Sequence, residues 1–403
     1  MGFRGFESTP PHKTDINYRL AIGNCRFTVS IINQNSIIMS EKSIMEAKLN
    51  SMLSRKKHDI GAVVSHISQS GTMIDDYVVD VPDMRFGATK SEQVNGVYIQ
   101  YPDHRGRMQT NTIHDNAYNQ FGGKFGIPNG FLRNLAHGDE WQQNLAADLL
   151  REHAHNGGRN RMLLRTVGGQ TRAALSDRYK RLNSLKIFLT FLQAAQQSNA
   201  VLVDAHNGET RAFMEIIHPE VIEFDTPLNG LNHVCFGARL RNSDFGHGAL
   251  ELSLYLLVLK CLNGQTGQSL LRAVHMGGEI PQNIEISDET VIKDTEAKAS
   301  LVKDAMMSVY TPDNREKLIE AVKGASKVEI DVKKETEKLP KLGLSKAEVQ
   351  EFERLMLNNS PEDGLVGAPT KWKLVNGLTA MARDSEPERK RELEKIAGEM
   401  LGI

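Results

Sequence analysis

The chain has little cysteine and no long hydrophobic run. Its 403 residues contain only Cys25, Cys235 and Cys261, which are widely separated and lie in apolar stretches. An odd number at such spacing argues against a disulfide framework or a zinc knuckle. No run reaches the roughly eighteen apolar residues of a membrane helix, and the start MGFRGFESTPPHKTD lacks the apolar core of a secretory signal. We therefore expect a cytoplasmic protein with no membrane partner.

An excess of charge of one sign is also absent. Lys and Arg number 49 against 50 Asp and Glu, so the formal net charge is −1. This balance argues against a protein that coats duplex nucleic acid all over, although it is compatible with a local basic groove. Aromatic residues make up 6%, which is low for a binder dominated by base stacking. With 40% hydrophobic and 25% charged residues, the chain can bury a normal core in two or three domains.

Recognised catalytic motifs are missing as well. The sequence has no GxSxG elbow, no HExxH, and neither GxxxxGK[ST] nor GxGxxG spacing for phosphate. Close pairs such as His153 with His155 do not form a known ligand set, so a metal centre is a less favoured alternative. We expect no cofactor and no metal, and favour a binding protein over an enzyme.

The order of patterns along the chain predicts an α+β fold, with a mostly antiparallel curved sheet, flanking helices and a helical C-terminal segment. Among the expected helices is a long one from about Ala249 to Cys261. The composition then shifts to acids and lysines, which suggests helical spacers and exposed linkers. The expected division is an N-terminal arm at 1–75, a core domain at 76–275, a charged region at 276–340 and C-terminal helices at 341–403. Core packing of those last helices is favoured over a separate partner-binding module.

Residues 151–186 form the most basic stretch, with nine Lys or Arg against two acids. The pieces MLLRTV and TRAALSDRY around GGQ predict a β-hairpin with Arg165 and Arg172 close to the turn. Strand alternation would put Arg172 and Ser176 on one face that can meet a phosphate backbone. In the alternative interpretation, the arginines are solvated or paired with acids of residues 204–225, and Tyr179 is a core residue rather than a base-stacking face.

A second polar group follows the piece FGARLRN. A strand ending in Arg239 and Arg241 is expected to turn through Asn242, Ser243 and Asp244 into the helix from Ala249. A helix N-terminus beside arginines is a ready anion site, because its first N–H groups are unpaired. Ordinary turn and cap chemistry explains the same residues equally well.

Several pieces, in order, resemble one family. The segments IHDNAYNQFGGKFGIPNGFLRNL, LLRTVGGQTRAALSDRYKRLNS, RNSDFGHGALELSLYLLVLKCLNGQTG and TKWKLVNGLTAMA resemble the uncharacterised phage/plasmid-like protein family, with its Ser-Asp-Arg-Tyr and Asn-Ser-Glu-Val-Gly signatures. The resemblance covers roughly 110–270 and 370–402. The chain departs from it at Asp244 and Phe245, where the family tends to have Glu and Val. The shorter acid puts a geometry-sensitive catalytic role in doubt.

The resemblance implies carriage on a phage or mobile element and brings no established activity. Members are distantly similar to single-strand annealing recombination proteins, which have a curved antiparallel sheet with helices and assemble into rings or filaments around a basic groove. This implied function agrees with the cationic hairpin expected from the residues themselves.

The leading hypothesis is a recombination protein that binds single-stranded DNA, promotes annealing and forms a homo-oligomer in the cytoplasm of a bacterial host. The alternatives are a metal-dependent enzyme acting on nucleic acid or nucleotide, with Asp177, Asp244 and His247 in one cleft, and a protein-binding anti-defence factor. The predicted nucleic-acid-binding residues are Arg159, Arg161, Arg165, Arg172, Arg178, Tyr179, Lys180, Arg181, Arg239 and Arg241, and the residues expected to orient them are Ser176, Asp177, Asn242, Ser243 and Asp244.

Overall fold

The computed structural model describes residues 17–22, 25–30, 40–55, 60–90, 95–158, 160–180, 182–275, 287–358, 360 and 363–402. The chain divides into two compact units, residues 1–55 and 56–403. In the first unit, strands β1 (Asn17–Ile22) and β2 (Cys25–Ser30) pair antiparallel. Helix α1 (Glu41–Arg55) follows them in the chain.

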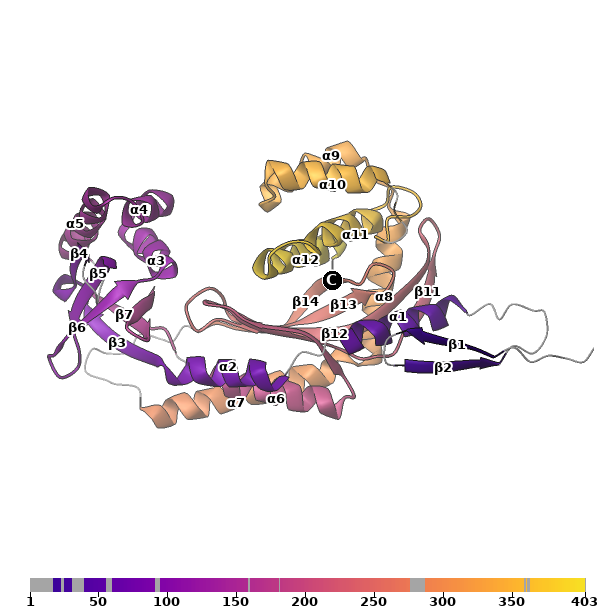
Figure 1. The fold of residues 1–403 in the computed structure, drawn as a ribbon, viewed down its shortest axis with the longest axis horizontal. Helices are drawn as coiled ribbons and strands as arrows, with labels where there is room; N and C mark the ends of the chain where they lie inside the picture. Colours follow the sequence, from indigo (N-terminus) through magenta and orange to yellow (C-terminus); the bar gives the residue numbers. More distant parts are fainter. Residues whose placement is uncertain are drawn as a thin grey trace, which may run out of the picture. The chain divides into compact units, whose positions relative to one another are not determined.

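The second unit contains two six-stranded sheets, shown in Figure 1. We call the first the hairpin sheet, with strand order β3-β7-β8-β6-β5-β4. Its strands are β3 (Ile74–Asp80), β4 (Arg85–Lys90), β5 (Asn95–Pro102), β6 (Met108–Ile113), β7 (Arg161–Val167) and β8 (Gln170–Leu175), with a short 3₁₀ turn η1 (Val81–Asp83). Neighbouring strands run antiparallel, except that β6 and β8 run parallel. Helices α3 (Asp115–Phe125), α4 (Asn129–Ala136) and α5 (Glu140–Asn156) complete this part.

We call the second sheet the long sheet, with order β14-β13-β12-β10-β9 and β11 also paired to β12. All its pairs are antiparallel. Its strands are β9 (Val201–Asn207), β10 (Ala212–Ile217), β11 (Ile222–Thr226), β12 (Gly230–Asn242), β13 (Leu250–Val258) and β14 (Asn263–Ala273). The expected α+β class, with mostly antiparallel sheets and flanking helices, is confirmed.

The helices around the long sheet come from distant parts of the chain. They are α2 (Ile60–Thr72), α6 (Ser184–Gln197), α7 (Asp288–Val309), α8 (Pro312–Lys327), α9 (Val332–Thr336), η2 (Leu339–Leu342), α10 (Lys346–Asn358), α11 (Lys371–Ala382) and α12 (Pro387–Leu401). Figure 1 shows α6 and α7 along one face of the sheet, and α11 and α12 over the opposite face. Among the described residues, no helix is long and apolar enough to cross a membrane.

Strand alternation explains the two faces of the long sheet. Side chains such as Ala238 and Leu240 of β12 belong to the apolar core. Arg239 points to the opposite face and reaches Glu394 of α12, because successive strand residues point to opposite sides. One face of the sheet is therefore an ordinary hydrophobic core, whereas the face under α12 contains buried charge.

The predicted helix from Ala249 to Cys261 is wrong. Residues Leu250–Val258 form β13, and all nine are buried between β12 and β14. A short apolar run without clear alternation fits a buried strand as well as a buried helix. The expected helix N-terminus near Asp244 is therefore also wrong, since that segment turns from one strand into the next.

The charged region after residue 287 contributes to the core. Helices α7 and α8, expected as spacers and linkers, bury Val302, Met306, Leu318 and Val322 in the cluster that covers the long sheet. Each helix exposes a charged face and buries an apolar stripe, which a composition average does not separate.

The C-terminal helices pack on the core rather than standing apart. Trp372 of α11 is buried and its Nε1 donates to Asn232 Oδ1 of β12 at 3.1 Å. Gly398 brings α12 against β14, since a Cβ there would lie 1.7 Å from the Thr266 carbonyl oxygen.

Replacing Gly398 by alanine should therefore lower the free energy of unfolding by about 1–3 kcal/mol, because the methyl group overpacks the contact with β14. Alanine at Gly324 of α8 is the matched control, since a Cβ there meets no heavy atom of the described residues within 4 Å. That change should stabilise the protein by about 0.5–1 kcal/mol through helix propensity. Urea denaturation followed by circular dichroism measures both changes. Equal stabilisation by the two alanines would contradict the close packing of α12.

Candidate functional site

The basic hairpin forms as the sequence predicts. Strands β7 and β8 pair antiparallel around Gly168 and Gly169, whose φ angles of 57° and 82° suit a tight turn. The second strand ends at Leu175, so Ser176 lies beyond it and does not share a strand face with Arg172.

A β-bulge separates the two arginines of the hairpin. Arg165 is paired with Ala173 and Thr166 with Thr171, which leaves Arg172 as the extra residue of β8. A bulge bends the strand and re-aims a side chain. As a result, Arg165 points into the protein, whereas Arg172 lines a cavity.

Arg165 is a structural residue in this arrangement. Its side chain is 0% exposed, and it donates to Asp76 Oδ1 and Oδ2 of β3 at 2.7 and 2.8 Å. A third bond reaches the backbone oxygen of Asp244, and the guanidinium lies 5.3 Å from the ring centre of Tyr179. The prediction that Arg165 contacts phosphate is corrected accordingly, because its hydrogen-bonding groups are committed inside the protein.

Tyr179 is likewise held inside. Its hydroxyl donates to the Ser243 backbone oxygen at 2.7 Å, and its ring stacks on His275 with centroids 5.0 Å apart. Burial raises the pKa of this phenol and is the largest cause. The alternative interpretation of Tyr179 as a core residue fits these contacts, and the expected base-stacking face is already occupied by His275.

The turn between β12 and β13 forms a hydrogen-bonded cluster with the start of α6. Asn242 Nδ2 donates to Ser184 Oγ at 2.8 Å, and Ser184 Oγ donates to Asp244 Oδ2 at 2.6 Å. Asn242 Oδ1 lies 2.8 Å from Nε2 of His275, whose pKa is lowered chiefly by burial. Ser243 Oγ donates to the Thr210 backbone oxygen at 2.7 Å and closes the turn. This cluster fixes the Asp244 carboxylate in one orientation.

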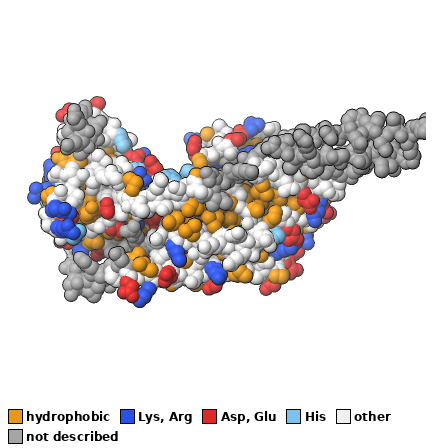
Figure 2. All heavy atoms as spheres, turned by 60° about the horizontal axis from the view of Figure 1, so that its bottom comes forward, with side chains coloured by type: hydrophobic (Ala, Val, Ile, Leu, Met, Phe, Trp, Pro, Cys, Tyr) orange, Lys and Arg blue, Asp and Glu red, His pale blue; other side chains and the backbone are white. Residues whose placement is uncertain are grey.

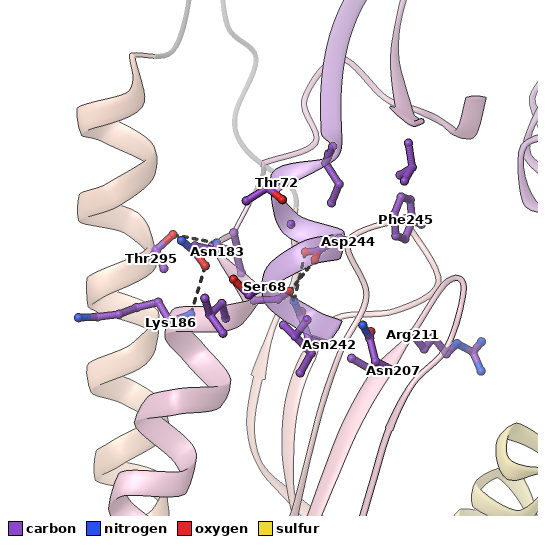
Figure 3. Close-up of a pocket in the computed structure, with 18 of the residues that line it drawn as sticks. Ser68, Thr72, Asn183, Lys186, Asn207, Arg211, Asn242, Asp244, Phe245 and Thr295 are labelled. Carbon is purple, nitrogen blue, oxygen red and sulfur yellow. Dashed lines mark hydrogen bonds between the residues drawn. The ribbon is translucent and has the colours of Figure 1, made fainter. Parts of the chain in front are cut away.

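A cavity of about 750 Å³, which we call the hairpin cleft, lies beside this cluster. Its walls come from α2, the hairpin, the start of α6, the β9–β10 loop, the β12–β13 turn and α7. Figure 3 shows Ser68 and Thr72 of α2, Asn183 at the start of α6, and Asn242 with Asp244 gathered in this region. The volume falls within the roughly 300–1,000 Å³ of small-molecule sites.

The charge at the cleft is uneven. Arg172 is a wall residue, and its buried Nε has no hydrogen-bond partner among the residues that the structure describes. Lys186 and Arg211 also border the cleft, but Figure 3 shows their side chains extending away from it. Arg211 Nε donates to the His247 backbone oxygen at 3.0 Å. The arrangement therefore suits a ligand with one anionic group at Arg172 and neutral polar groups elsewhere.

The two arginines of the second predicted pair, Arg239 and Arg241, form ion pairs with glutamates. Arg239 is buried and bonded to Glu215 and Glu394, while Arg241 pairs with Glu251. Glu215 belongs to the acids of 204–225, which the alternative interpretation named as arginine partners. The prediction of Arg239 as a phosphate contact is corrected, since its guanidinium is enclosed under α12.

The remaining predicted residues lie along or near the hairpin. Ser176 and Asp177 form a local turn in which Ser176 Oγ accepts from the Arg178 backbone N–H at 3.3 Å. Lys180 uses its backbone to hold His275, with its N–H donating to the His275 oxygen at 2.7 Å. Arg161 Nε lies 3.8 Å from Asp80 Oδ1. Arg159 and Arg181 lie outside the described residues.

The carboxylates and histidine of the enzyme hypothesis have other partners. Asp177 is exposed and bonds Ser176, whereas His247 Nε2 bonds Asn116 Oδ1. Within the described part of the chain, no group of three or more His, Cys, Asp or Glu is placed to hold a metal ion.

Sequence reasoning missed several residues of the cleft. They are Ser68 and Thr72 of α2, Ser184 of α6, Asn207 at the end of β9 and Thr210 in the loop that follows β9. Only Asn183 with Ser184 had a local signal, because Asn is a preferred helix N-cap and its Oδ1 accepts from the Lys186 N–H. The other residues carry no pattern that would distinguish them from ordinary surface residues.

Comparison with known proteins found no match, either among protein-family models or among curated proteins and solved structures.

Proposed function

We propose that this protein binds single-stranded DNA at the hairpin cleft and promotes strand annealing, as a phage or mobile-element recombination protein in a bacterial cytoplasm. The observation that carries the proposal is Arg172, an arginine that lines a cavity of about 750 Å³. A phosphate oxygen is a suitable acceptor for the N–H groups of a guanidinium at such a wall. The distant similarity of the phage/plasmid-like family, which the sequence resembles, to single-strand annealing proteins favours DNA as the ligand.

The chain next to the cleft supplies further positive charge. Between Arg172 and Lys186, both of which border the cleft, lie Arg178 and Lys180. A strand that leaves the cleft along this segment would bring its phosphates near Arg178 and Lys180. Backbone charge contacts of this kind give affinity without sequence preference. Arg165 and Arg239 have no part in this proposal, because both are buried.

The proposed protein needs no cofactor and works as a homo-oligomer. Figure 2 shows hydrophobic side chains gathered on the face that includes α6 and α7. Ile292, Leu301 and Met307 of α7 are 45–58% exposed. Apolar side chains gathered on one face can meet another chain, and on this ground we assign that face to self-association into a ring or filament.

Replacing Arg172 by alanine should weaken binding to a labelled oligo-dT about tenfold at physiological salt, since it removes one charge-assisted contact. The slope of log affinity against log salt should also fall by about 0.7, the share of one phosphate on a single strand. Fluorescence anisotropy across a salt series measures both quantities.

Arg354 of α10 provides the matched control, because it is an exposed arginine that pairs with Glu351. Its alanine variant should bind like the wild type. Lysine at position 172 should restore the slope of log affinity against log salt but only part of the affinity. It keeps the positive charge but lacks the planar guanidinium that can donate two parallel hydrogen bonds. Equal binding by the wild type and the Arg172→Ala variant would exclude Arg172 as a phosphate contact.

A further inference from the structure

We propose that the hairpin cleft receives one unpaired base of the bound strand, with the adjoining phosphate on Arg172. The proposal rests on the proposed function and names the part of the DNA that the cavity accepts. A base needs a site with flat apolar walls and a few polar groups for its edge.

The walls of the cleft provide apolar surface from several directions. Ile67 comes from α2, Leu182 from the segment just before α6, Leu185 from the start of α6, Phe245 from the β12–β13 turn and Val291 from α7. Ile67, Leu182 and Phe245 are buried and belong to the packed cores beneath. Because these residues are fixed by packing, the cavity is pre-formed, and a planar ring can enter it without rearranging the core.

The polar groups of the cleft suit a base edge better than a second phosphate. Asn183 and Asn207 carry amides, which can both donate and accept, and Ser68 and Thr72 carry hydroxyls. Asp244 and Glu296 also line the cleft, and carboxylates repel additional phosphates. With Arg172 as the cation at the wall and two acids nearby, the site accommodates a single phosphate and disfavours a di- or triphosphate.

The orientation of Asp244 gives this site a defined acceptor. Ser184 Oγ at 2.6 Å and Asn242 Nδ2 at 3.4 Å bond its two carboxylate oxygens. Each oxygen has a second acceptor position, because a carboxylate offers about four lone-pair sites. Exocyclic amino groups and ring N–H groups of bases are the matching donors. The cleft therefore offers a base one acceptor that is fixed in place.

Gly71 allows the cavity to be filled without disturbing the core. It lies in α2 and lines the cleft, and a Cβ there would meet no heavy atom of the described residues within 4 Å. Phenylalanine at this position would project into the space proposed for the base. The control is phenylalanine at Gly324 of α8. A Cβ at Gly324 also meets no heavy atom of the described residues within 4 Å, and this residue does not line the cleft.

The experiment compares intact oligo-dT with an abasic strand of the same length, which keeps the phosphates and lacks the bases. Wild-type protein should bind the intact strand about tenfold more tightly than the abasic strand, the worth of one bound base. Gly71→Phe should bind both strands with the affinity that the wild type has for the abasic strand. Gly324→Phe should behave like the wild type.

A second measurement separates this proposal from the proposed function. Titration with thymidine monophosphate, followed by NMR, should shift signals of the wild type and leave those of Gly71→Phe unchanged. If Gly71→Phe discriminates between the two strands as the wild type does, the base site is wrong while DNA binding stands. If neither strand binds, the proposed function fails, and a nucleotide titration that Gly71→Phe abolishes would still support the cleft as a nucleotide site. A wild type that binds neither strand nor nucleotide overturns both.

Discussion

Replacing Arg239 by methionine should lower the free energy of unfolding by about 3–5 kcal/mol, the largest loss expected for any single substitution considered. Arg239 Nε donates to Glu215 Oε1 of β10 at 2.9 Å. The same guanidinium also bonds Glu394 of α12. Methionine keeps most of the volume but leaves the two buried carboxylates without this partner. Urea denaturation near neutral pH measures the change.

The deficit of the Arg239→Met variant should depend on pH in a defined direction. Burial is the largest cause that raises the pKa of Glu394, Glu215 raises it further, and Arg239 lowers it. Without Arg239 the folded state holds this proton more tightly than the unfolded chain does, so stability falls as pH rises above the ordinary carboxyl pKa. The deficit should therefore be smaller near pH 5 than near pH 7.

A neutral triple variant serves as the control. Changing Glu215 and Glu394 to glutamine together with Arg239→Met removes all three charges, and should recover much of the lost stability because no buried charge then lacks a partner. A deficit that is equal at both pH values and unchanged in the triple variant would show that packing, not charge, holds α12 on the sheet.

Replacing Arg165 by alanine should lower the free energy of unfolding by about 3 kcal/mol, through the loss of a buried guanidinium with its hydrogen bonds and of packed volume. Arg165 joins β7 to Asp76 of β3 and to the backbone of Asp244. Arg354 of α10 is the control, since its side chain is 58% exposed and pairs with Glu351 at the surface, and its alanine variant should lie within about 0.5 kcal/mol of the wild type. A loss below about 1 kcal/mol for Arg165→Ala would contradict its structural role.

The hairpin could be predicted because its signals are local. Two strand-like runs around Gly168 and Gly169 define the turn, and the residue order fixes the positions of the arginines. The burial of Arg165 could not be predicted, because its partner Asp76 is 89 residues away in the chain. Likewise, the extra residue at Arg172 depends on the register of two strands, which the pattern of β8 alone does not reveal.

The cleft itself was beyond sequence reasoning for a similar reason. The cluster Asn242, Ser243 and Asp244 was identified as a polar turn near a possible anion site, and the structure places it beside the hairpin. The prediction was wrong for the segment that follows, Ala249 to Cys261, because a short apolar run fits either a strand or a helix. Helices α2 and α7, which complete the walls, carry no local signal that connects them to this turn.

The central claim is that single-stranded DNA lies along the hairpin cleft and along the basic segment formed by residues 172–186. Photo-crosslinking of a 5-iodouracil oligonucleotide to the full chain, with the crosslinked peptides identified by mass spectrometry, locates the strand directly. We predict crosslinks in α2 and in residues 172–186, which the Gly324→Phe variant retains and the Gly71→Phe variant reduces at α2. Crosslinks confined to other surfaces, such as α10 or α12, or no crosslink at physiological salt, would contradict the account.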